Sequence, residues 1–316
     1  MDFQKVVLKL VKQIPKGKVT SYMEIAKALG DRRASRAVGT ALNQNPRPIK
    51  IPCHRVVHSN GEIGGYKLGI EEKIRLLESE GIRIRGNKVA NFGNVFFKDF
   101  KTDYLLKKLR ETQKKVKKDI LVEDEFDKIE KVAGFDVAYS RNEPSMAYGA
   151  CSVFDNKTMN EMEFKIVSMK ISFPYVSTYL SFREFPVIQK LMEKIKSTPD
   201  ILMIDGNGIL HPFGVGLASY TGIMLNIPTI GVAKKLLCGK INKIPLEKWD
   251  SSEIEYKNRL VGYALKSTDS SLIYISPGHK ISLKTSLEIT KKFTKYKIPE
   301  PIRISHIRAT KLSRHL

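Results

Sequence analysis

The hydrophobic pattern of this chain changes partway along, and that change constrains the fold more than any other feature of the sequence. Up to about residue 100, short segments with helical spacing are interrupted by Pro and Gly. From Lys131 onward, alternating apolar segments typical of strands come first, and strands alternating with helices follow. The 316 residues are enough for two domains of ordinary size. We therefore predict an α/β protein with two different domains, residues 1–100 and 101–316.

The first domain is predicted to be small and helical, with a helix-turn-helix. Ser21 and Glu24 have the spacing of a capping box, and Gly30 can end the helix that they begin. A short turn separates this helix from a second one, which stops before Pro46. Small residues dominate the second helix, so another backbone can approach it closely. That neighbour is either part of the core or, as the nearby arginines favour, the groove of a nucleic acid. For the second domain we predict a mixed sheet with helices packed on it.

The charge balance indicates a polyanionic partner. Lys and Arg total 55 against 33 Asp and Glu, which gives a net charge of +22. This excess favours nucleic acid, although basic surface helices would also raise the count. The three widely separated cysteines form neither a zinc motif nor a disulfide framework, which favours a reducing compartment. Without a recognisable signal peptide or long apolar segment, we expect a cytoplasmic, nucleoid-associated monomer with no membrane contact.

Cys53 is the cysteine with the most unusual neighbours, because it lies between Pro52 and His54. A free thiol is only a few per cent ionised at neutral pH, and a neighbouring base raises that fraction. Adjacent side chains on an extended segment point opposite ways, so proton transfer to His54 requires a water bridge or a turn. Glu80 is a candidate to orient the imidazole. The residues alone leave two alternatives open, an activated cysteine or a small buried one.

A resemblance decides between these alternatives. The segments SYMEIAKALG, RAVGTALNQNP, IPCHRVV and GGYKLGIEEKIRLLESEG resemble the C-terminal, DNA-binding domain of the O6-alkylguanine-DNA alkyltransferases over roughly residues 1–100. The resemblance implies that Cys53 accepts the alkyl group once, without a cofactor, while His54 and Glu80 relay its proton. Further implied roles are the support of the active-site turn by Asn45, extrusion of the damaged nucleotide by Tyr22 and Arg36, and contacts to it from Tyr66 and Lys67. Lys67 stands where many members of the family have a serine.

Acidic residues inside apolar segments are the main feature of the second domain. Asp136 lies within VAGFDVAYS and Asp205 ends ILMID, where an acid is seldom present for packing alone. Two carboxylates about 4 Å apart repel by roughly 4 kcal/mol at an effective dielectric of about 20, and a divalent cation removes that penalty. Oxygen ligands select Mg²⁺, with Mn²⁺ as the alternative. Glu184 is a candidate third ligand, and His211 and His279 are candidate acid–base groups. Taken singly, each acid could instead be a cap or turn residue.

The second domain resembles endonuclease V over roughly residues 105–316. The segments that carry the resemblance are VAGFDVAYS, FREFP, PDILMIDGNGILHP, GLASYTGI, IPTIGVAKKLL, SPGHKIS and IPEPIRISH. It implies an RNase H-like sheet that nicks DNA at the second phosphodiester 3′ to deoxyinosine. Implied roles are metal binding by Asp136, Glu184 and Asp205, assistance at the metal and water by His279, phosphate contact by Lys234, a stacking wedge at Tyr175, and a pocket for the deaminated base at Gly206, Asn207, Gly208 and His211. Ser177 replaces a proline of the family's wedge loop.

We therefore interpret the chain as a fused DNA-repair protein that acts on damaged purines in double-stranded DNA. Three alternatives remain from the residues: a damage sensor without catalysis, a nuclease for inosine-containing RNA or single strands, and a thiol hydrolase centred on Cys53. The hydrolase would turn over repeatedly, whereas the alkyltransferase acts once per molecule.

Overall fold

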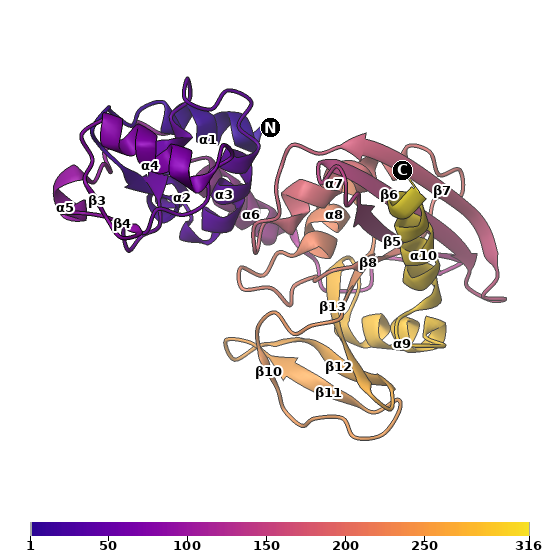
Figure 1. The fold of residues 1–316 in the computed structure, drawn as a ribbon. Helices are drawn as coiled ribbons and strands as arrows, with labels where there is room; N and C mark the ends of the chain where they lie inside the picture. Colours follow the sequence, from indigo (N-terminus) through magenta and orange to yellow (C-terminus); the bar gives the residue numbers. More distant parts are fainter. Residues whose placement is uncertain (1, 316) are drawn as a thin grey trace. The chain divides into compact units, whose positions relative to one another are not determined.

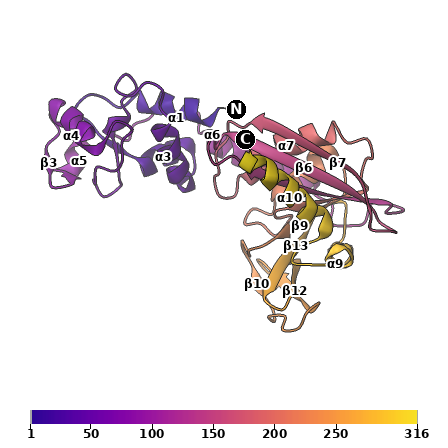
Figure 2. The ribbon, with the colours of Figure 1, turned by 45° about the vertical axis from the view of Figure 1, so that its right-hand side comes forward.

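The computed structural model describes residues 2–315, whose contacts divide the chain into two compact units. Unit 1 comprises Met1–Glu111 with Ser172–Ser177, and unit 2 comprises Thr112–Ile171 with Thr178–Leu316. Both are drawn in Figure 1 and, after rotation, in Figure 2. The first break between them lies at Glu111, inside helix α6 (Leu105–Val116), whereas the sequence pattern changes near residue 100.

Unit 1 is mainly helical, as predicted. The Ser21 side chain accepts a hydrogen bond from the backbone N–H of Glu24 at 3.0 Å, and Gly30 ends the helix with φ 104°. The Glu24 carboxylate pairs with Lys27 at 2.9 Å. Of the two hydrogen bonds of the predicted capping box, the structure therefore shows the one accepted by Ser21. The elements of this unit are α1 (Phe3–Val11), β1 (Thr20–Ser21), α2 (Tyr22–Leu29), α3 (Ser35–Asn43), β2 (Val56–Val57), α4 (Ile70–Ser79), β3 (Ile84–Arg85), β4 (Lys88–Val89) and α5 (Phe92–Val95).

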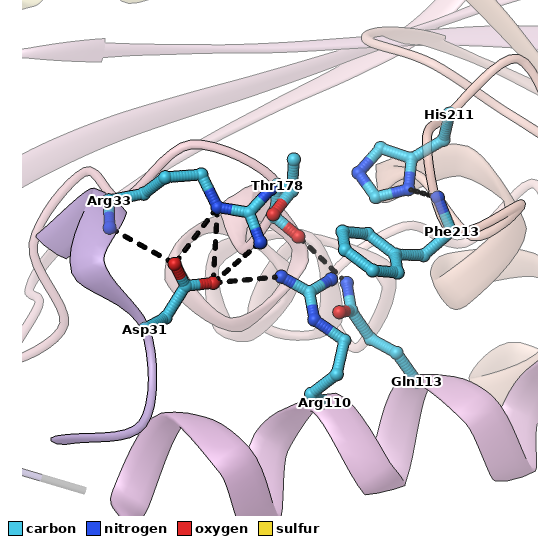
Figure 3. Close-up of polar contacts among 7 residues, drawn as sticks. All are labelled: Asp31, Arg33, Arg110, Gln113, Thr178, His211 and Phe213. Carbon is cyan, nitrogen blue, oxygen red and sulfur yellow. Dashed lines mark hydrogen bonds and ion pairs between the residues drawn. The ribbon is translucent and has the colours of Figure 1, made fainter. Parts of the chain in front are cut away.

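Helix α6 is anchored by different partners along its length. In unit 1, the Asp31 carboxylate accepts hydrogen bonds from Arg33 and forms an ion pair with Arg110 at 3.5 Å (Figure 3). Asp31 also caps the 3₁₀ turn between α2 and α3 through the backbone N–H of Arg33. In unit 2, Gln113 donates to the carbonyl of Thr178 at 2.9 Å. Each of these contacts satisfies a polar group inside its own unit.

Unit 2 is built on one sheet of nine strands, ordered β10-β11-β12-β13-β9-β8-β5-β6-β7. The central pairs β5–β8 and β8–β9 are parallel, and the other neighbours are antiparallel, so the predicted mixed sheet is confirmed. The strands are β5 (Lys131–Tyr139), β6 (Met146–Asp155), β7 (Glu161–Lys170), β8 (Ile201–Asp205), β9 (Thr229–Ala233), β10 (Lys240–Ile241), β11 (Ser251–Glu255), β12 (Leu260–Thr268) and β13 (Ser271–His279).

Helices cover both faces of this sheet. Because successive residues of a strand point to opposite faces, Val132 and Met203 lie on one face while Phe135 and Leu202 lie on the other. The first face packs against α9 (Leu283–Phe293) and α10 (Glu300–His315), and the second against α7 (Leu180–Met192) and α8 (Leu217–Leu225). By the same alternation Asp136 and Asp205 belong to the α10 face. None of the helices in the described residues is long and apolar enough to cross a membrane.

We expect substitution of Gly134 by alanine to destabilise unit 2. A methyl group at this position of β5 would overlap the backbone of Pro301 and Ile302 in α10. Backbone atoms cannot move aside as a flexible side chain can, so α10 must shift, at a cost of about 1–3 kcal/mol or more. Urea unfolding should show a lower midpoint. Gly93→Ala is the control, because a Cβ there has no neighbour within 4 Å. An unchanged midpoint for Gly134→Ala would contradict the close packing.

Candidate active sites

The Cys53 thiol sits on a 3₁₀ turn, Cys53–Arg55, rather than on an extended segment. Its side chain is almost fully buried, at 5% exposure. Asn45, itself buried, donates hydrogen bonds to the Cys53 sulfur at 3.0 Å and to the carbonyl of Ile51 at 3.1 Å. Burial raises the pKa of the Cys53 thiol, although Asn45 and the charges of Lys73 and Lys67 oppose that rise. The resting sulfur is therefore a protonated thiol that needs a base.

A buried imidazole lies next in the chain. His54 Nε2 is 3.0 Å from a carboxylate oxygen of Glu80, and Arg55 donates to the same carboxylate at 2.7 and 2.8 Å. Burial opposes ionisation of Glu80, but the hydrogen bonds from Arg55 and His54 outweigh it and lower the pKa of Glu80. Burial also lowers the pKa of His54, so the imidazole is neutral at pH 7. Since Glu80 can only accept, Nε2 carries the proton and Nδ1 is left as the base. Among the described residues Nδ1 has no hydrogen-bond partner.

Lys73 is a residue of this site that the sequence analysis missed. Its ammonium is fully buried and donates to the carbonyls of Val56 and Ile63, at 2.6 and 2.5 Å, with the carbonyls of Gly64 and Gly65 within 3.5 Å. The signal was available, because Lys73 occupies the apolar stripe of α4 four residues before Leu77. Lys73 fastens the strand after the cysteine to the loop that leads to Tyr66.

The residues expected to face DNA in unit 1 take several positions. Ala34, Ala37 and Ala41 are buried in the core, so these small residues serve helix packing, while Arg36 is exposed. Tyr22 donates to the carbonyl of Gly65 at 3.4 Å. The Tyr66 ring meets the His54 ring edge-on, with centroids 6.2 Å apart. Lys67 donates to the carbonyl of Asn45 at 3.1 Å.

The acidic residues of unit 2 come together at the end of β8, beside the middle of β5. Phe135 pairs with Ile204, so Asp136 and Asp205 follow at adjacent positions of two parallel strands. Each of the three acids has its own partner. His306 on α10 is 2.7 Å from Asp136, Tyr139 donates to Glu184 at 2.8 Å, and Lys234 donates to Asp205 at 2.5 Å. The structure thus brings the predicted acids and Lys234 into one neighbourhood.

These partners compensate the charges of the acidic group only in part. Burial raises the pKa of Glu184 to about 8, and the charges of Asp136 and Asp205 add to the effect. Burial and Asp136 likewise raise the pKa of Asp205, in spite of Lys234. Within residues 2–315, no three acidic, His or Cys side chains stand in an arrangement ready to hold a metal ion. The oxygen donors and their mutual repulsion nevertheless fit a divalent cation, which would replace the present partners.

His306, rather than His279, is the histidine at the acidic group. The hydrogen bond to Asp136 raises the pKa of His306. His279 instead packs against Gly222 of α8 and accepts a hydrogen bond from the backbone N–H of Leu121 at 3.3 Å. The charges that act on its pKa are those of Lys280, Asp119 and Glu125, not those of the three acids. The segment IPEPIRISH contained His306, but nothing local in it signals a contact with a residue 170 positions away.

The segment after Asp205 is held by backbone contacts. Gly206 donates to the carbonyl of Val232 at 3.1 Å, and Gly208 donates to the Ser276 hydroxyl at 2.9 Å. A Cβ at Gly208 would overlap the carbonyl of Pro277, so the close approach requires glycine. The Asn207 side-chain oxygen is buried without a hydrogen-bond partner among the described residues. His211 is buried, and its Nδ1 accepts the backbone N–H of Phe213 at 3.3 Å (Figure 3). Tyr175 is 67% exposed.

Comparison with known proteins assigns a family to each part of the chain. Residues 112–307 match the family model of endonuclease V, which covers more than half of the chain. The chain belongs to the endonuclease V family. Residues 2–82 match the DNA-binding domain of 6-O-methylguanine DNA methyltransferase. Both predicted resemblances are therefore confirmed. Endonucleases V are metal-dependent nucleases.

Relatives and solved structures show how far the likeness extends. A bifunctional methyltransferase/endonuclease of Picrophilus torridus is 37% identical over 315 residues, 100% of this chain and 98% of that protein. One of Thermoplasma volcanium is 41% identical over 72% of this chain and 68% of its own. The crystal structure of human endonuclease V covers 66% of this chain and 98% of its own, with 28% identity and a TM-score of 0.61. Ciona intestinalis endonuclease V, solved with a DNA that contains inosine, is 28% identical over 66% of this chain and 98% of its own, with a TM-score of 0.59.

Replacement of Lys73 by methionine should change how stability depends on pH. Burial lowers the pKa of Lys73 to about 8, from 10.5 in the unfolded chain. Between these values the unfolded state binds more protons, so the contribution of Lys73 to the free energy of unfolding rises with pH. The free energy of unfolding of the wild type minus that of Lys73→Met should therefore increase by up to about 3 kcal/mol from pH 8 to pH 10.5.

Urea unfolding at a series of pH values measures this difference. Lys50→Met, which removes an exposed ammonium of the same unit, is the control. If the free energy of unfolding of the wild type minus that of the variant stays constant or decreases over this pH range, Lys73 is not buried as an ammonium.

Proposed function

We propose that this chain is a DNA-repair protein with two independent active sites, one that removes alkyl groups from O6 of guanine and one that nicks DNA near deaminated bases. One observation carries the proposal: a chain similar along its whole length to a bifunctional methyltransferase/endonuclease contains both chemical groups intact. These are the Asn45-held thiol with the His54–Glu80 pair, and the three acids Asp136, Glu184 and Asp205 with Lys234.

In alkyl transfer, the Cys53 sulfur attacks the carbon bonded to O6 of guanine. An S–C bond forms and the C–O bond breaks with its electron pair, so guanine leaves and takes up a proton. The thiol proton passes through a water to His54 Nδ1, which the Nε2–Glu80 hydrogen bond keeps available. The thioether product is stable, so each molecule reacts once. Because O6 lies inside the stacked duplex, the nucleotide must first be turned out, at about a few kcal/mol. Tyr22 and exposed Arg36 take the roles of extrusion and of filling the gap.

In nicking, Asp136, Glu184 and Asp205 would hold Mg²⁺, with Mn²⁺ as a substitute. A cation bound there supplies an activated water and neutralises charge on the phosphate. Lys234 stabilises phosphate charge, and the His306 imidazolium fixes the orientation of Asp136. The chain cuts the second phosphodiester 3′ to deoxyinosine, leaving a 3′-hydroxyl and a 5′-phosphate. The deaminated base binds at Gly206, Asn207, Gly208 and His211. In support of this role, the buried side-chain oxygen of Asn207 has no hydrogen-bond partner within residues 2–315 and could accept one from the base. His279, placed away from the acids, supports the fold instead.

The damaged purine in duplex DNA is the partner that both sites share. Exposed Tyr175 is the wedge that stacks beside the extruded base, worth about 1–3 kcal/mol. The net charge of +22 favours a polyanion. Three free cysteines suit a reducing compartment such as the cytoplasm, where we propose that the chain acts as a monomer. An inosine-containing RNA is the second candidate for the nuclease, and competition between DNA and RNA oligonucleotides decides between them.

Single substitutions should separate the two activities. Cys53→Ser should abolish transfer of a labelled methyl group from an O6-methylguanine duplex and leave nicking of a deoxyinosine duplex unchanged, because only the nucleophile is lost. Asp136→Ala should abolish nicking and spare methyl transfer. Cys238→Ser removes a thiol outside both sites and should affect neither activity. If either active-site variant lost both activities, the two sites would not be independent.

Metal binding should release protons in a pH-dependent way. Because burial raises the pKa of Glu184 to about 8, a cation must displace its proton at pH 7. We expect Mg²⁺ affinity to fall as the pH decreases from 8, and calorimetry in buffers of different ionisation enthalpy to show about one proton released at pH 7. Glu184→Gln should lose this release, whereas Glu193→Gln, on the exposed end of the same helix, should keep it. Chelation of the metal should stop nicking and leave methyl transfer intact. Binding without proton release would contradict a protonated Glu184.

A further inference from the structure

Unit 2 contains a cavity of about 630 Å³ that neither the thiol site nor the three acids line. Its volume is within the range of about 300–1,000 Å³ that small-molecule sites occupy. Three segments distant in the sequence converge on it. They are the segment that follows α6, the loop after β8, and the turn between β11 and β12. The lining residues are Lys117, Ile120, Val122, Ile209, His211, Pro212, Gly214, Tyr256, Lys257, Arg259, Leu260 and Val261.

The cavity is cationic at its rim and apolar on its floor. Lys117, Lys257 and Arg259 are exposed, and no Asp or Glu stands among the lining residues of the described chain. Such a set favours an anion, and a lysine or arginine beside a phosphate is the usual arrangement. The floor consists of isoleucine, valine and leucine side chains with the ring of Tyr256. A ligand that fits both parts therefore has a phosphate and a flat, largely apolar group.

The backbone is shaped to present these cations. Gly214 has φ 71°, and a Cβ there would lie 2.9 Å from Cε and 3.1 Å from Nζ of Lys117, so glycine leaves room for the lysine. Tyr256 and Arg259 exchange backbone hydrogen bonds of 2.9 and 3.3 Å, which closes a two-residue turn. Both turn residues, Lys257 and Asn258, have positive φ, 53° and 59°. Positive φ at both central residues is the ordinary geometry of a two-residue hairpin turn, and it places Lys257 at the tip of the β11–β12 hairpin.

We propose that this cavity binds one nucleotide, with its phosphate at Lys117, Lys257 and Arg259 and its base against Tyr256 and the apolar floor. The nucleotide is either a free mononucleotide or an unpaired unit of a bound strand. The strand source rests on the proposed nuclease function, since His211 lies on the segment that begins at Asp205. The cavity shares His211 with the pocket proposed for the deaminated base, but Gly206, Asn207 and Gly208 do not line it, so the two sites are adjacent rather than the same.

The test measures binding of deoxyadenosine 5′-monophosphate and of a single-stranded oligodeoxynucleotide to the full chain, without metal. Lys117→Ala, Lys257→Ala and Arg259→Ala are combined in one variant, and all three residues are exposed, so folding should survive. The control combines Lys157→Ala, Lys194→Ala and Lys295→Ala, which removes the same charge from exposed positions outside the cavity. We expect binding to weaken about tenfold or more in the cavity variant, equal to about 1.4 kcal/mol, and to a smaller extent in the control.

Two further measurements separate the base from the phosphate and the cavity from the nuclease. Tyr256→Ala should weaken binding of the mononucleotide but not of deoxyribose 5-phosphate, which lacks a base. Loss confined to the oligonucleotide identifies the strand as the source, and loss with the mononucleotide identifies the free nucleotide. Asp136→Ala should keep the binding while it stops nicking, so failure of the nuclease proposal is seen separately. Equal weakening in the cavity variant and the control, or no binding of either probe, would overturn the proposal.

Discussion

Both active sites depend on how the protein treats charge that is buried. Water stabilises an ion far better than a protein interior does, so a buried charge must have a partner or be neutralised, an acid by taking up a proton and an amine by releasing one. In unit 1, Arg55 and His54 hold Glu80 as a carboxylate, whereas the carbonyl groups around Lys73 offset its burial only in part, because its pKa is lowered to about 8. In unit 2 the internal partners of Glu184 are also insufficient, and its pKa is raised to about 8 by burial and by two neighbouring acids. The repulsion among these acids is the reason why we propose a cation for this site and none for the thiol.

The two sites therefore use protonation in opposite ways. At Cys53 the neutral thiol is the resting state, and in the proposed reaction its proton passes to the neutral imidazole of His54, whose Nδ1 has no hydrogen-bond partner within residues 2–315. A thiol that stayed ionised would be open to oxidation before it met a lesion. At the acids, the proposal is that Glu184 is protonated in the absence of a cation and releases its proton when the cation binds. In each case the reactive state appears only when substrate or metal supplies the missing interaction.

The sequence predicted what depends on local pattern. Ser21 and Gly30 limit their helix as expected, and the apolar alternation around Asp136 gives a strand. The contact between His54 and Glu80 agrees with the resemblance carried by two segments, IPCHRVV and GGYKLGIEEKIRLLESEG. The sequence did not predict contacts that only the tertiary fold creates. His306 reaches Asp136 because α10 packs on β5, and Lys73 is buried because its neighbours in space are backbone carbonyls. The place of Lys73 in the apolar stripe of α4 indicates its burial but not these partners. The contact of His306 leaves no periodic trace, so the sequence favours His279, in a recognisable glycine-containing motif, for the role at the acids.

The position of α10 links the packing of unit 2 to its chemistry. Gly134 lies two residues before Asp136, and without a side chain it allows the backbone of Pro301 and Ile302 to approach β5 directly. The Ser305 hydroxyl then donates to the carbonyl of Gly134 at 2.8 Å, which fixes the turn of helix that carries His306. The 2.7 Å contact between His306 and Asp136 therefore follows from a backbone-to-backbone contact, not from the mutual attraction of the two side chains alone. A half-exposed ion pair contributes little by itself, so the helix must already be in place before the pair can form.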